Sequence, residues 1–264
     1  MRRLFKHYTW LFSIAWARAF GRAWLAPAHQ ALLSLSLHAL GYDNCVGSNT
    51  GEAWFVRHIL SRHPIKVCLD IGANVGDYSE RLARELDGAT IYAFEPAQGT
   101  FDALKRRFTG IPRIVPVRSA VTNHDGTAPL YLPAPGAETA TLERSIFPDA
   151  AAEEVPVMSV DSFARSRAID RIDFVKIDTE GFERETLEGM QESLLTLRPR
   201  LIQFEFNHLQ LYRGYSLYDL SRLLPGYRLF RLLPRGFVAV DPRSSRDNVY
   251  RYANYVAVRD DLSL

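Results

Sequence analysis

The sequence predicts an α/β fold in which a mostly parallel sheet is flanked by helices. Three observations support this prediction. From residue 64 onward, short strand-like runs alternate with helix-like runs of ten to sixteen residues. The strand-like runs are almost continuously apolar, as expected when helices cover both faces of a sheet. A glycine-containing turn, Asp70–Gly76, joins the first strand-like run to the first helix-like run.

The predicted elements follow one another in a regular order. Strands are predicted at 65–70, 90–94, 113–117, 172–178 and 201–206. Helices are predicted between them at 77–86, 99–108 and 182–197. Further runs at 227–233, 237–240 and 255–258 have no long helix between them, which predicts an antiparallel end to the sheet.

The chain is long enough for one large domain, or for a domain with an extension. We expect a helical extension at residues 1–47 and a single domain at residues 48–264. Within the domain, segment 122–155 is too long for a simple connection and is rich in proline, so it is predicted to be an insertion near the ligand-binding edge.

Composition narrows the class of protein. Apolar residues make up 47% of the chain and charged residues 23%, which is typical of a globular protein. The net charge of +2 gives no indication of a nucleic-acid partner, and none is predicted. The two cysteines, Cys45 and Cys68, form neither a disulfide framework nor a metal-ligand pattern. A reducing, cytoplasmic location is therefore expected.

Residues 1–42 form a basic segment that is rich in tryptophan. They contain five Arg or Lys residues and no Asp or Glu, and three of the four tryptophans, Trp10, Trp16 and Trp24, lie there. The rest of the chain carries 27 basic and 30 acidic residues, a net charge of −3. The uncharged stretch 23–42 includes Pro27 and several polar residues, which makes it a poor membrane-spanning helix.

Three interpretations of this segment remain open. Wound as a helix, the segment places seven apolar residues on one face and its first three basic residues elsewhere, which is typical of peripheral contact with an anionic membrane. The seven are Leu4, Phe5, Tyr8, Leu11, Phe12, Ala15 and Ala19. It also fits a helical hairpin that packs on the domain or on a second subunit of a homodimer. Its composition resembles an organelle transit peptide as well.

The turn Asp70–Gly76 indicates what kind of ligand binds. Turns of this type lie at the carboxyl edge of the strands, where ligands bind in open α/β sheets. Gly72 can adopt a positive φ and so let a ligand approach the backbone. The spacing between Gly72 and Gly76 differs from that of a dinucleotide-binding turn, and Asp70 would repel a phosphate and attract a cation. Glu95 ends the next strand, where a carboxylate can accept both hydroxyls of a ribose; it can also be a helix N-terminal acid.

Three segments, Val67–Ser79, Ala93–Pro96 and Val175–Glu183, resemble the FkbM family over roughly residues 48–258. The resemblance implies an S-adenosylmethionine-dependent O-methyltransferase with the class I, Rossmann-like fold. It places Gly72, Ala73, Asn74 and Gly76 under the methionine part of the cofactor, Asp70 near the sulfonium and amino end, and Glu95 at the ribose. Ser119, after the third strand, would reach the adenine edge; alternatively, its hydroxyl binds the backbone.

The resemblance also places Asp178 and Glu180 where the methyl group meets its acceptor. They are predicted to be a general base or orienting carboxylates, with Lys176 as a buried partner of one of the acids. Glu183 completes an acidic cluster that could hold a metal or stabilise a helix N-terminus; a metal is not predicted.

At the end of the fifth strand, His208 is a second candidate base and Asn207 could orient the acceptor. His124 and Glu52 are weaker candidates. The expected acceptor is a hydroxyl of a sugar, a glycan or a related small molecule. The competing functions are a nicotinamide-dependent oxidoreductase, disfavoured by the glycine spacing and Asp70, and a non-catalytic membrane-surface scaffold.

Overall fold

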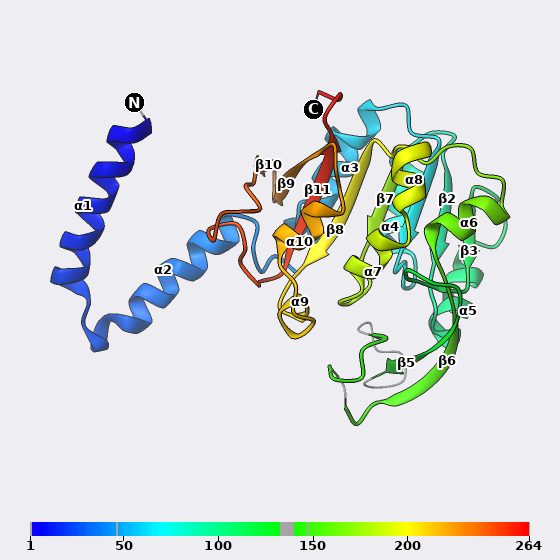
Figure 1. The fold of residues 1–264 in the computed structure, drawn as a ribbon, viewed down its shortest axis with the longest axis horizontal. Coiled ribbons are helices and arrows are strands. Elements are labelled where there is room, and N and C mark those ends of the chain that lie inside the picture. Colours follow the sequence, from blue (N-terminus) through cyan, green and yellow to red (C-terminus); the bar gives the residue numbers. More distant parts are fainter. Residues whose placement is uncertain (1, 46, 133–139, 147, 264) are drawn as a thin grey trace.

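The computed structural model describes the backbone of residues 2–45, 47–132, 140–146 and 148–263, with side chains except those of residues 2–9, 47 and 48. The described residues form an eight-stranded sheet in the order β10-β9-β11-β8-β7-β1-β2-β3 (Figure 1). Five neighbouring strands are parallel: β3 (Ile114–Val117), β2 (Thr90–Phe94), β1 (Val67–Ile71), β7 (Phe174–Ile177) and β8 (Leu201–Phe206).

The other end of the sheet is antiparallel, as predicted. Strand β11 (Ala253–Arg259) runs antiparallel to both of its neighbours, β8 and β9 (Tyr227–Leu233). Strand β10 (Gly236–Ala239) pairs antiparallel with β9. The predicted α/β class, with its class I, Rossmann-like sheet, is therefore confirmed.

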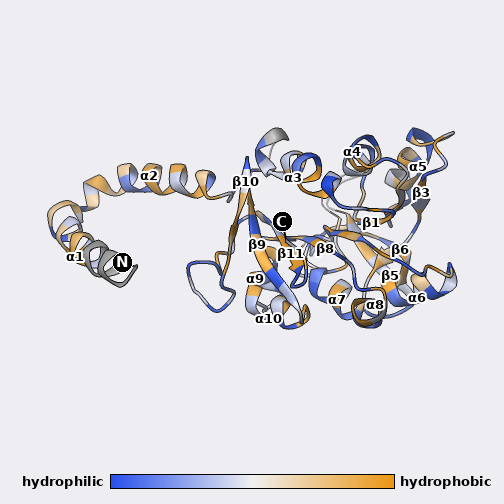
Figure 2. Ribbon diagram, turned by 90° about the horizontal axis from the view of Figure 1, so that it is seen from above, coloured by the Kyte–Doolittle hydropathy of each residue, from blue (hydrophilic) through white to orange (hydrophobic). Residues whose placement is uncertain are grey.

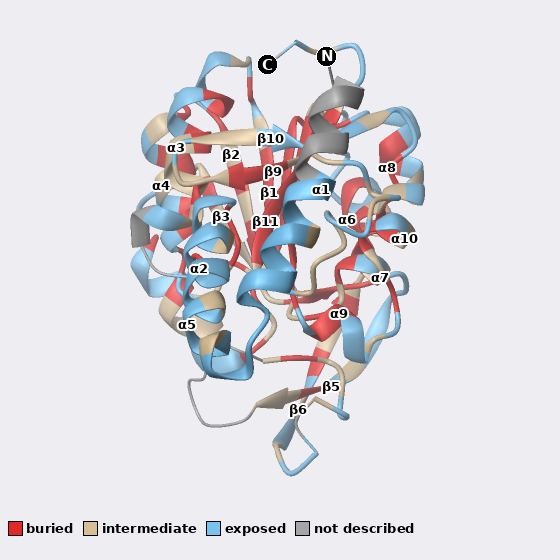
Figure 3. Ribbon diagram, turned by 90° about the vertical axis from the view of Figure 1, so that its left-hand side faces the viewer, coloured by how far each residue is buried: buried red, intermediate tan, exposed pale blue. Residues whose placement is uncertain are grey.

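Helices cover both faces of the sheet (Figure 3). One layer contains α3 (Glu52–His58), α4 (Asp77–Glu85) and α5 (Gln98–Arg107). The other contains α6 (Val160–Ser166), α7 (Glu183–Glu188), α8 (Gln191–Thr196) and α10 (Leu217–Arg222). Short helical turns lie at Gly47–Thr50, Leu60–Arg62 and Leu209–Tyr212 (α9).

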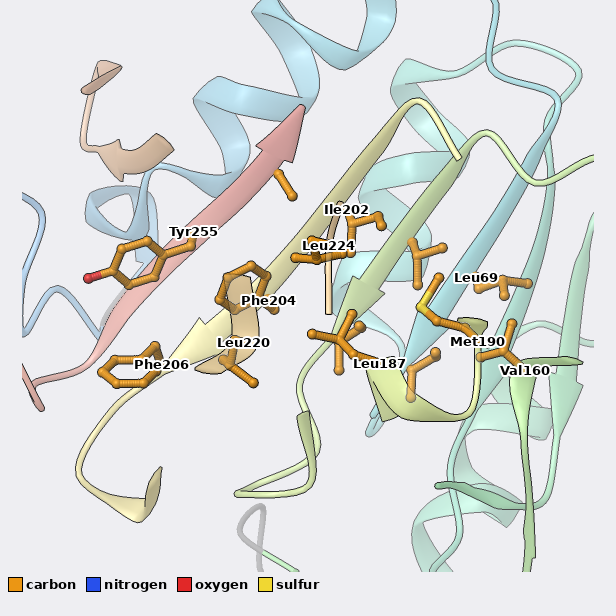
Figure 4. Packing of buried hydrophobic residues seen from close by; sticks show 14 of the residues in the cluster. Leu69, Val160, Leu187, Met190, Ile202, Phe204, Phe206, Leu220, Leu224 and Tyr255 are labelled. Carbon is orange, nitrogen blue, oxygen red and sulfur yellow. The ribbon is translucent and has the colours of Figure 1, made fainter. Parts of the chain in front are cut away.

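The apolar residues of the strands alternate between these two layers. In β1, Cys68 is buried against the first layer, whereas Leu69 and Ile71 are buried in the second. In the second layer, Leu187 and Met190 lie against the sheet beside strand residues such as Ile202 and Phe204 (Figure 4). Burial on both faces explains why the strands read as continuous apolar runs.

The helix predicted at 182–197 is in fact two helices, α7 and α8, separated at Gly189. A Cβ at Gly189 would lie 2.1 Å from the carbonyl oxygen of Thr122, which is too close for any side chain. The backbone of another segment crosses the helix at this point, and the apolar periodicity of the sequence gave no sign of that crossing.

The insertion predicted at 122–155 contains regular structure. Its described residues contribute β5 (Gly126–Leu132) and most of β6 (Ala151–Met158), which pair antiparallel. With β4 (Ala120–Val121) they form a three-stranded sheet in the order β4-β6-β5. Pro133, Pro135 and Gly136, which belong to this insertion, lie outside the described residues.

The N-terminal segment forms two helices, α1 (Arg2–Phe20) and α2 (Ala26–Ala39), joined by a turn at Ala23–Leu25. They project away from the domain, and only the end of α2 meets it (Figure 2). Leu37 is the α2 residue that packs on the core. The described side chains therefore do not support packing of this hairpin on its own domain. No helix among the described residues has the length and apolar character needed to cross a membrane.

Candidate functional site

A pocket lies at the carboxyl ends of the parallel strands, beside the insertion. The turns after β1, β2, β3 and β7 line it, together with three apolar residues of the insertion. The lining residues that matter below are Gly72, Asn74, Glu95, Ser119, Leu130, Ala140, Leu142, Asp178, Glu180 and Phe182. The structure thus brings together predicted residues from four separate strand ends.

The turn after β1 is held close to the neighbouring strand. Gly72 has a φ of +82°, and a Cβ there would lie 1.7 Å from the carbonyl oxygen of Asp178. The backbone N–H groups of Gly72 and Ala73 donate to the carbonyl of Phe94, at 3.1 and 2.8 Å. Only glycine combines this conformation with such a close approach. The expected positive φ at Gly72 is confirmed.

Gly76 serves the same turn from its other end. Its φ is +94°, and it is the N-cap residue that immediately precedes α4. A Cβ there would lie 2.4 Å from the ring of Phe108. Together with Asn74, which also has a positive φ, this glycine closes the turn tightly against α5. Gly72 therefore forms part of the pocket wall, and Gly76, which does not line the pocket, holds the turn behind that wall.

Asp70 lies behind this wall and is fully buried. One carboxylate oxygen accepts a hydrogen bond from the Ser79 hydroxyl at 2.6 Å. The other, Oδ1, has no hydrogen-bond partner among the described residues. Burial raises the pKa of Asp70, and the nearby Lys176 ammonium opposes that rise. A buried carboxylate oxygen without a partner is unfavourable, so a cationic or donor group beside it would be stabilising.

Lys176 is the buried cation of this region. Its Nζ lies 2.9 Å from Oδ2 of Asp178 and 5.1 Å from the centre of the Tyr78 ring. Burial alone would lower the pKa of Lys176, but the carboxylates of Asp178, Asp70 and Glu52 more than offset this and raise it. The predicted pairing of Lys176 with one of the nearby acids is confirmed, and its partner is Asp178. Asp178 itself remains about one-third exposed and lines the pocket.

Glu95 is held at the pocket wall by backbone groups. It is 7% exposed, and its two oxygens accept from the N–H groups of Ala97 at 2.9 Å and Asn74 at 3.2 Å. Burial raises the pKa of Glu95 to about 7, and these two donors limit the rise. The side chain is thus fixed with its carboxyl group at the pocket, where it can accept further hydrogen bonds.

Ser119 also lines the pocket, but its hydroxyl faces the backbone. The Oγ atom lies within donating distance of the carbonyls of Ala120, at 2.8 Å, and Pro156, at 3.2 Å. Of the two roles expected for Ser119, the structure shows the one in which its hydroxyl binds the backbone. The oxygen of Ser119 can still accept a hydrogen bond from a ligand.

Glu180 lines the pocket in an unusual conformation. Its φ is +52°, which is sterically unfavourable for a residue with a Cβ. The Glu180 carbonyl accepts from the Thr141 hydroxyl of the insertion at 2.9 Å. Burial, with repulsion from Asp178 and Glu183, raises the pKa of Glu180 to about 8. The structure therefore holds a strained, partly buried carboxyl group at the pocket, and such groups are candidates for proton transfer.

Glu183, three residues later, has a different environment. It is 1% exposed and does not line the pocket. One of its oxygens accepts from the N–H of Thr179 at 3.0 Å, and the other accepts from Gln210 at 2.6 Å and Tyr215 at 3.3 Å. Burial raises its pKa, and the Thr179 N–H opposes the rise. Glu183 thus ties the turn after β7 to the segment that follows β8.

The predicted residues after β8 are not brought into the pocket. Asn207 is buried, and its amide group donates to Glu205 and accepts from the N–H of Leu209 at 2.7 Å. His208 is exposed and lies against the Tyr212 ring. Neither residue lines the pocket. Their roles as orienting group and base stay predictions without support from the pocket geometry.

Two weaker candidates are also placed elsewhere. His124 is exposed beside Asn123. Glu52 lies behind the pocket wall, where it accepts from Gln203 at 2.8 Å and from Thr50 at 3.2 Å. The described residues contain no group of three or more His, Cys, Asp or Glu side chains arranged to hold a metal.

Sequence reasoning missed Glu205, a buried carboxyl group on β8. Burial, with repulsion from Asp178, Glu180 and Glu183, raises its pKa well above the ordinary range. Its place near the end of a strand beside β7 was the available signal. Around one buried cation, Lys176, the structure therefore gathers an excess of acidic groups, which favours a positively charged ligand without phosphate.

Comparison with known proteins gives the context of this site. A model of the methyltransferase FkbM domain matches residues 70–232, more than half of the chain. The chain is 26% identical to hexuronic acid methyltransferase AglP of Haloferax volcanii, over 68% of this chain and 70% of that protein. It is 25% identical to 2-O-methyltransferase NoeI of Sinorhizobium fredii, over 78% and 90% respectively. It is 28% identical to 31-O-demethyl-FK506 methyltransferase FkbM of Streptomyces tacrolimicus, over 55% and 71%.

Proposed function

The chain belongs to the FkbM methyltransferase family, and on that premise we propose that it methylates a hydroxyl group of a sugar, a glycan or a related small molecule. It is a methyltransferase, and S-adenosylmethionine is its methyl donor. The observation that supports the proposal best is that one pocket is lined by Asn74 and Glu95, from the ends of β1 and β2, and by Asp178 and Glu180, from the end of β7.

The acidic character of the pocket fits this donor. S-adenosylmethionine carries an activated methyl group on a positively charged sulfur, together with an ammonium group and a ribose. Glu95, already fixed by two backbone N–H groups, would accept hydrogen bonds from the ribose hydroxyls. Asp70, whose Oδ1 lacks a partner among the described residues, and Asp178 would favour the positive end.

Glu180 is the proposed proton acceptor. With a pKa of about 8, its ionised form is basic enough to take a proton from an acceptor hydroxyl as that oxygen attacks the methyl carbon. Asp178, held by Lys176, would orient the acceptor. Placing the acceptor oxygen in line with the methyl–sulfur bond would supply a further part of the rate enhancement.

The acceptor class rests on the relatives. One is named for hexuronic acid and another for 2-O-methylation, and both names fit a sugar hydroxyl. The insertion adds an apolar wall, Leu130, Ala140 and Leu142, next to the carboxyl groups of the pocket. A sugar ring presents both apolar C–H faces and hydroxyls, so it matches a mixed wall of this kind. The oxidoreductase and the scaffold interpretations do not fit a methyltransferase family.

The test is transfer of a radiolabelled methyl group from S-adenosylmethionine by the purified full-length chain. The acceptor panel contains hexuronic acids, hexuronate-bearing glycans, neutral sugars and non-sugar alcohols. We expect label on a sugar hydroxyl, and transfer that is slower by about 10²-fold or more with a Glu180→Gln variant. Label on a non-sugar alcohol alone would contradict the acceptor class, and failure to bind S-adenosylmethionine would contradict the function itself.

A further inference from the structure

The N-terminal arm, residues 1–42, carries an unusual concentration of exposed apolar side chains. Among the described side chains, ten of the seventeen large hydrophobic residues that are exposed lie between residues 10 and 40. Trp24 is 78% exposed and Leu35 is 70% exposed. Such a concentration on one projecting element marks an interaction surface rather than a scatter of single residues.

The aromatic residues of α1 form a continuous ridge. The rings of Phe12, Trp16 and Phe20 follow at four-residue spacing, with centres 5.9 and 4.5 Å apart. The elbow between the helices is held by His29, whose ring contacts Trp16 and whose Nε2 lies 3.1 Å from the Phe20 carbonyl. These contacts of His29 therefore fix the bend between the two helices that carry the exposed apolar side chains.

The root of the arm is fixed to the domain. Tyr42 is buried under the guanidinium of Arg231, which lies 4.1 Å from its ring centre. Arg231 also donates to the carbonyl of Leu40 at 2.7 Å, and Asn44 donates to the carbonyl of His38 at 2.8 Å. The domain thus sets the direction in which the exposed part projects.

Charge decides which partner fits this surface. The arm has five basic and no acidic residues, whereas the rest of the chain has a net charge of −3. Pairing of two arms would bring five cations against five with no acidic side chain between them. An anionic lipid surface instead attracts the cations and accepts tryptophan and leucine side chains at its interface.

We propose that the N-terminal arm binds the surface of an anionic membrane and tethers the methyltransferase domain there. The arm would lie in the interface and not cross it, because no described helix is long and apolar enough to span a bilayer. Trp24 and Leu35 would enter the lipid, and Arg18 and Arg22 would contact the headgroups.

Vesicle flotation of the full-length chain tests this. One set of vesicles contains phosphatidylcholine with phosphatidylglycerol, and the other contains phosphatidylcholine alone. The double variant Trp24→Ser/Leu35→Ser removes two exposed apolar groups and should weaken binding about tenfold or more. Arg18→Glu/Arg22→Glu reverses two charges and should weaken it by a similar factor, since each cation contributes about fivefold.

Matched controls lie on the domain. Leu195, 74% exposed, and Leu211 are replaced by Ser as the apolar control. Arg106 and Arg246, both exposed, are replaced by Glu as the charge control. The proposal is supported if both arm variants lose binding to the anionic vesicles and both controls keep it.

Three results would overturn it: no flotation of the full-length chain, equal flotation of arm variants and controls, or a dimer in sedimentation that does not float and that Trp24→Ser/Leu35→Ser dissociates. The last would make a second copy of the chain the partner of the arm.

Discussion

The turns after β1 and β2, here called the donor end, and the turn after β7, here called the acceptor end, contribute to the pocket in different ways. At the donor end, backbone groups fix the structure: Gly72 lies against a neighbouring carbonyl, and two N–H groups hold Glu95. At the acceptor end, carboxyl groups crowd together, and Glu180 is held in a strained conformation with a raised pKa. The difference suggests that the donor end determines the affinity for the cofactor and that the acceptor end determines the rate of methyl transfer.

The largest effect is expected from Glu180→Gln. If this carboxyl group accepts the proton, kcat on the acceptor identified by the methyl-transfer panel should fall by about 10²- to 10⁴-fold. The affinity for S-adenosylmethionine should not change. Glu188→Gln is the control, because Glu188 pairs with Arg184 on the same helix outside the pocket. Unchanged kcat in Glu180→Gln would remove Glu180 from the mechanism.

The same carboxyl group predicts two pH dependences. Activity should rise as the pH increases through about 8, where Glu180 ionises. A buried acid with a raised pKa stabilises the fold in its protonated form, so this contribution is complete below about pH 4.5 and is lost as the pH rises to about 8. The free energy of unfolding of the wild type should therefore fall relative to Glu180→Gln over that range. Parallel stability curves from urea unfolding would contradict the raised pKa.

Gly72→Ala tests the backbone construction of the donor end. The added Cβ would meet the carbonyl oxygen of Asp178 at 1.7 Å, in a conformation that already disfavours alanine. We expect the free energy of unfolding to fall by about 3 kcal/mol or more. Gly110→Ala is a matched control, since Gly110 has a φ of +84° but no atom within 4 Å of the added Cβ. It should lose only about 1 kcal/mol. Equal losses in urea unfolding would show that the close approach does not matter.

Glu95→Gln should act on cofactor affinity. Loss of the charged acceptor should weaken S-adenosylmethionine binding by about ten- to a hundredfold. Because burial raises the pKa of Glu95 to about 7, wild-type affinity should also fall as the pH drops through about 7, and the variant should lack this dependence. Calorimetric titration at several pH values measures both effects. Glu154→Gln, which removes an exposed carboxyl group of β6 outside the pocket lining, serves as control.

A smaller effect is expected from Arg213→Ala. Arg213 pairs with Glu143 of the insertion and Glu185 of α7, and lies 4.3 Å from the ring centre of Phe182. Loss of Arg213 should loosen the insertion and raise KM for the acceptor about threefold. This rise corresponds to a loss of about 1 kcal/mol or less in binding free energy. Cofactor affinity should stay the same. Arg184→Ala, which removes an exposed ion pair on α7, should leave KM unchanged. A similar rise of KM in Arg184→Ala would contradict a specific role of Arg213 in holding the insertion.

The donor end could be predicted from the sequence because short motifs build it. Asp70, Gly72 and Glu95 lie at the ends of two consecutive strands, and each is close in sequence to the turn that it shapes. The parallel strands and their order of alternation with helices were predicted for the same reason, since apolar runs are local signals.

The acceptor end could not be predicted to the same extent, because distant segments build it. Arg213 meets the insertion seventy residues away in sequence. Burial, together with repulsion from acids that follow another strand, raises the pKa of Glu205. The break at Gly189 and the sheet of the insertion likewise depend on segments that cross or pair at long range, and no periodicity of the chain records them.

The most direct test of the division between the two ends is calorimetric binding of S-adenosylmethionine to the wild type, Glu95→Gln and Glu180→Gln at one pH. We predict micromolar binding by the wild type and Glu180→Gln, and binding about ten- to a hundredfold weaker by Glu95→Gln. Equal weakening by the two substitutions, or unchanged binding by Glu95→Gln, would contradict it.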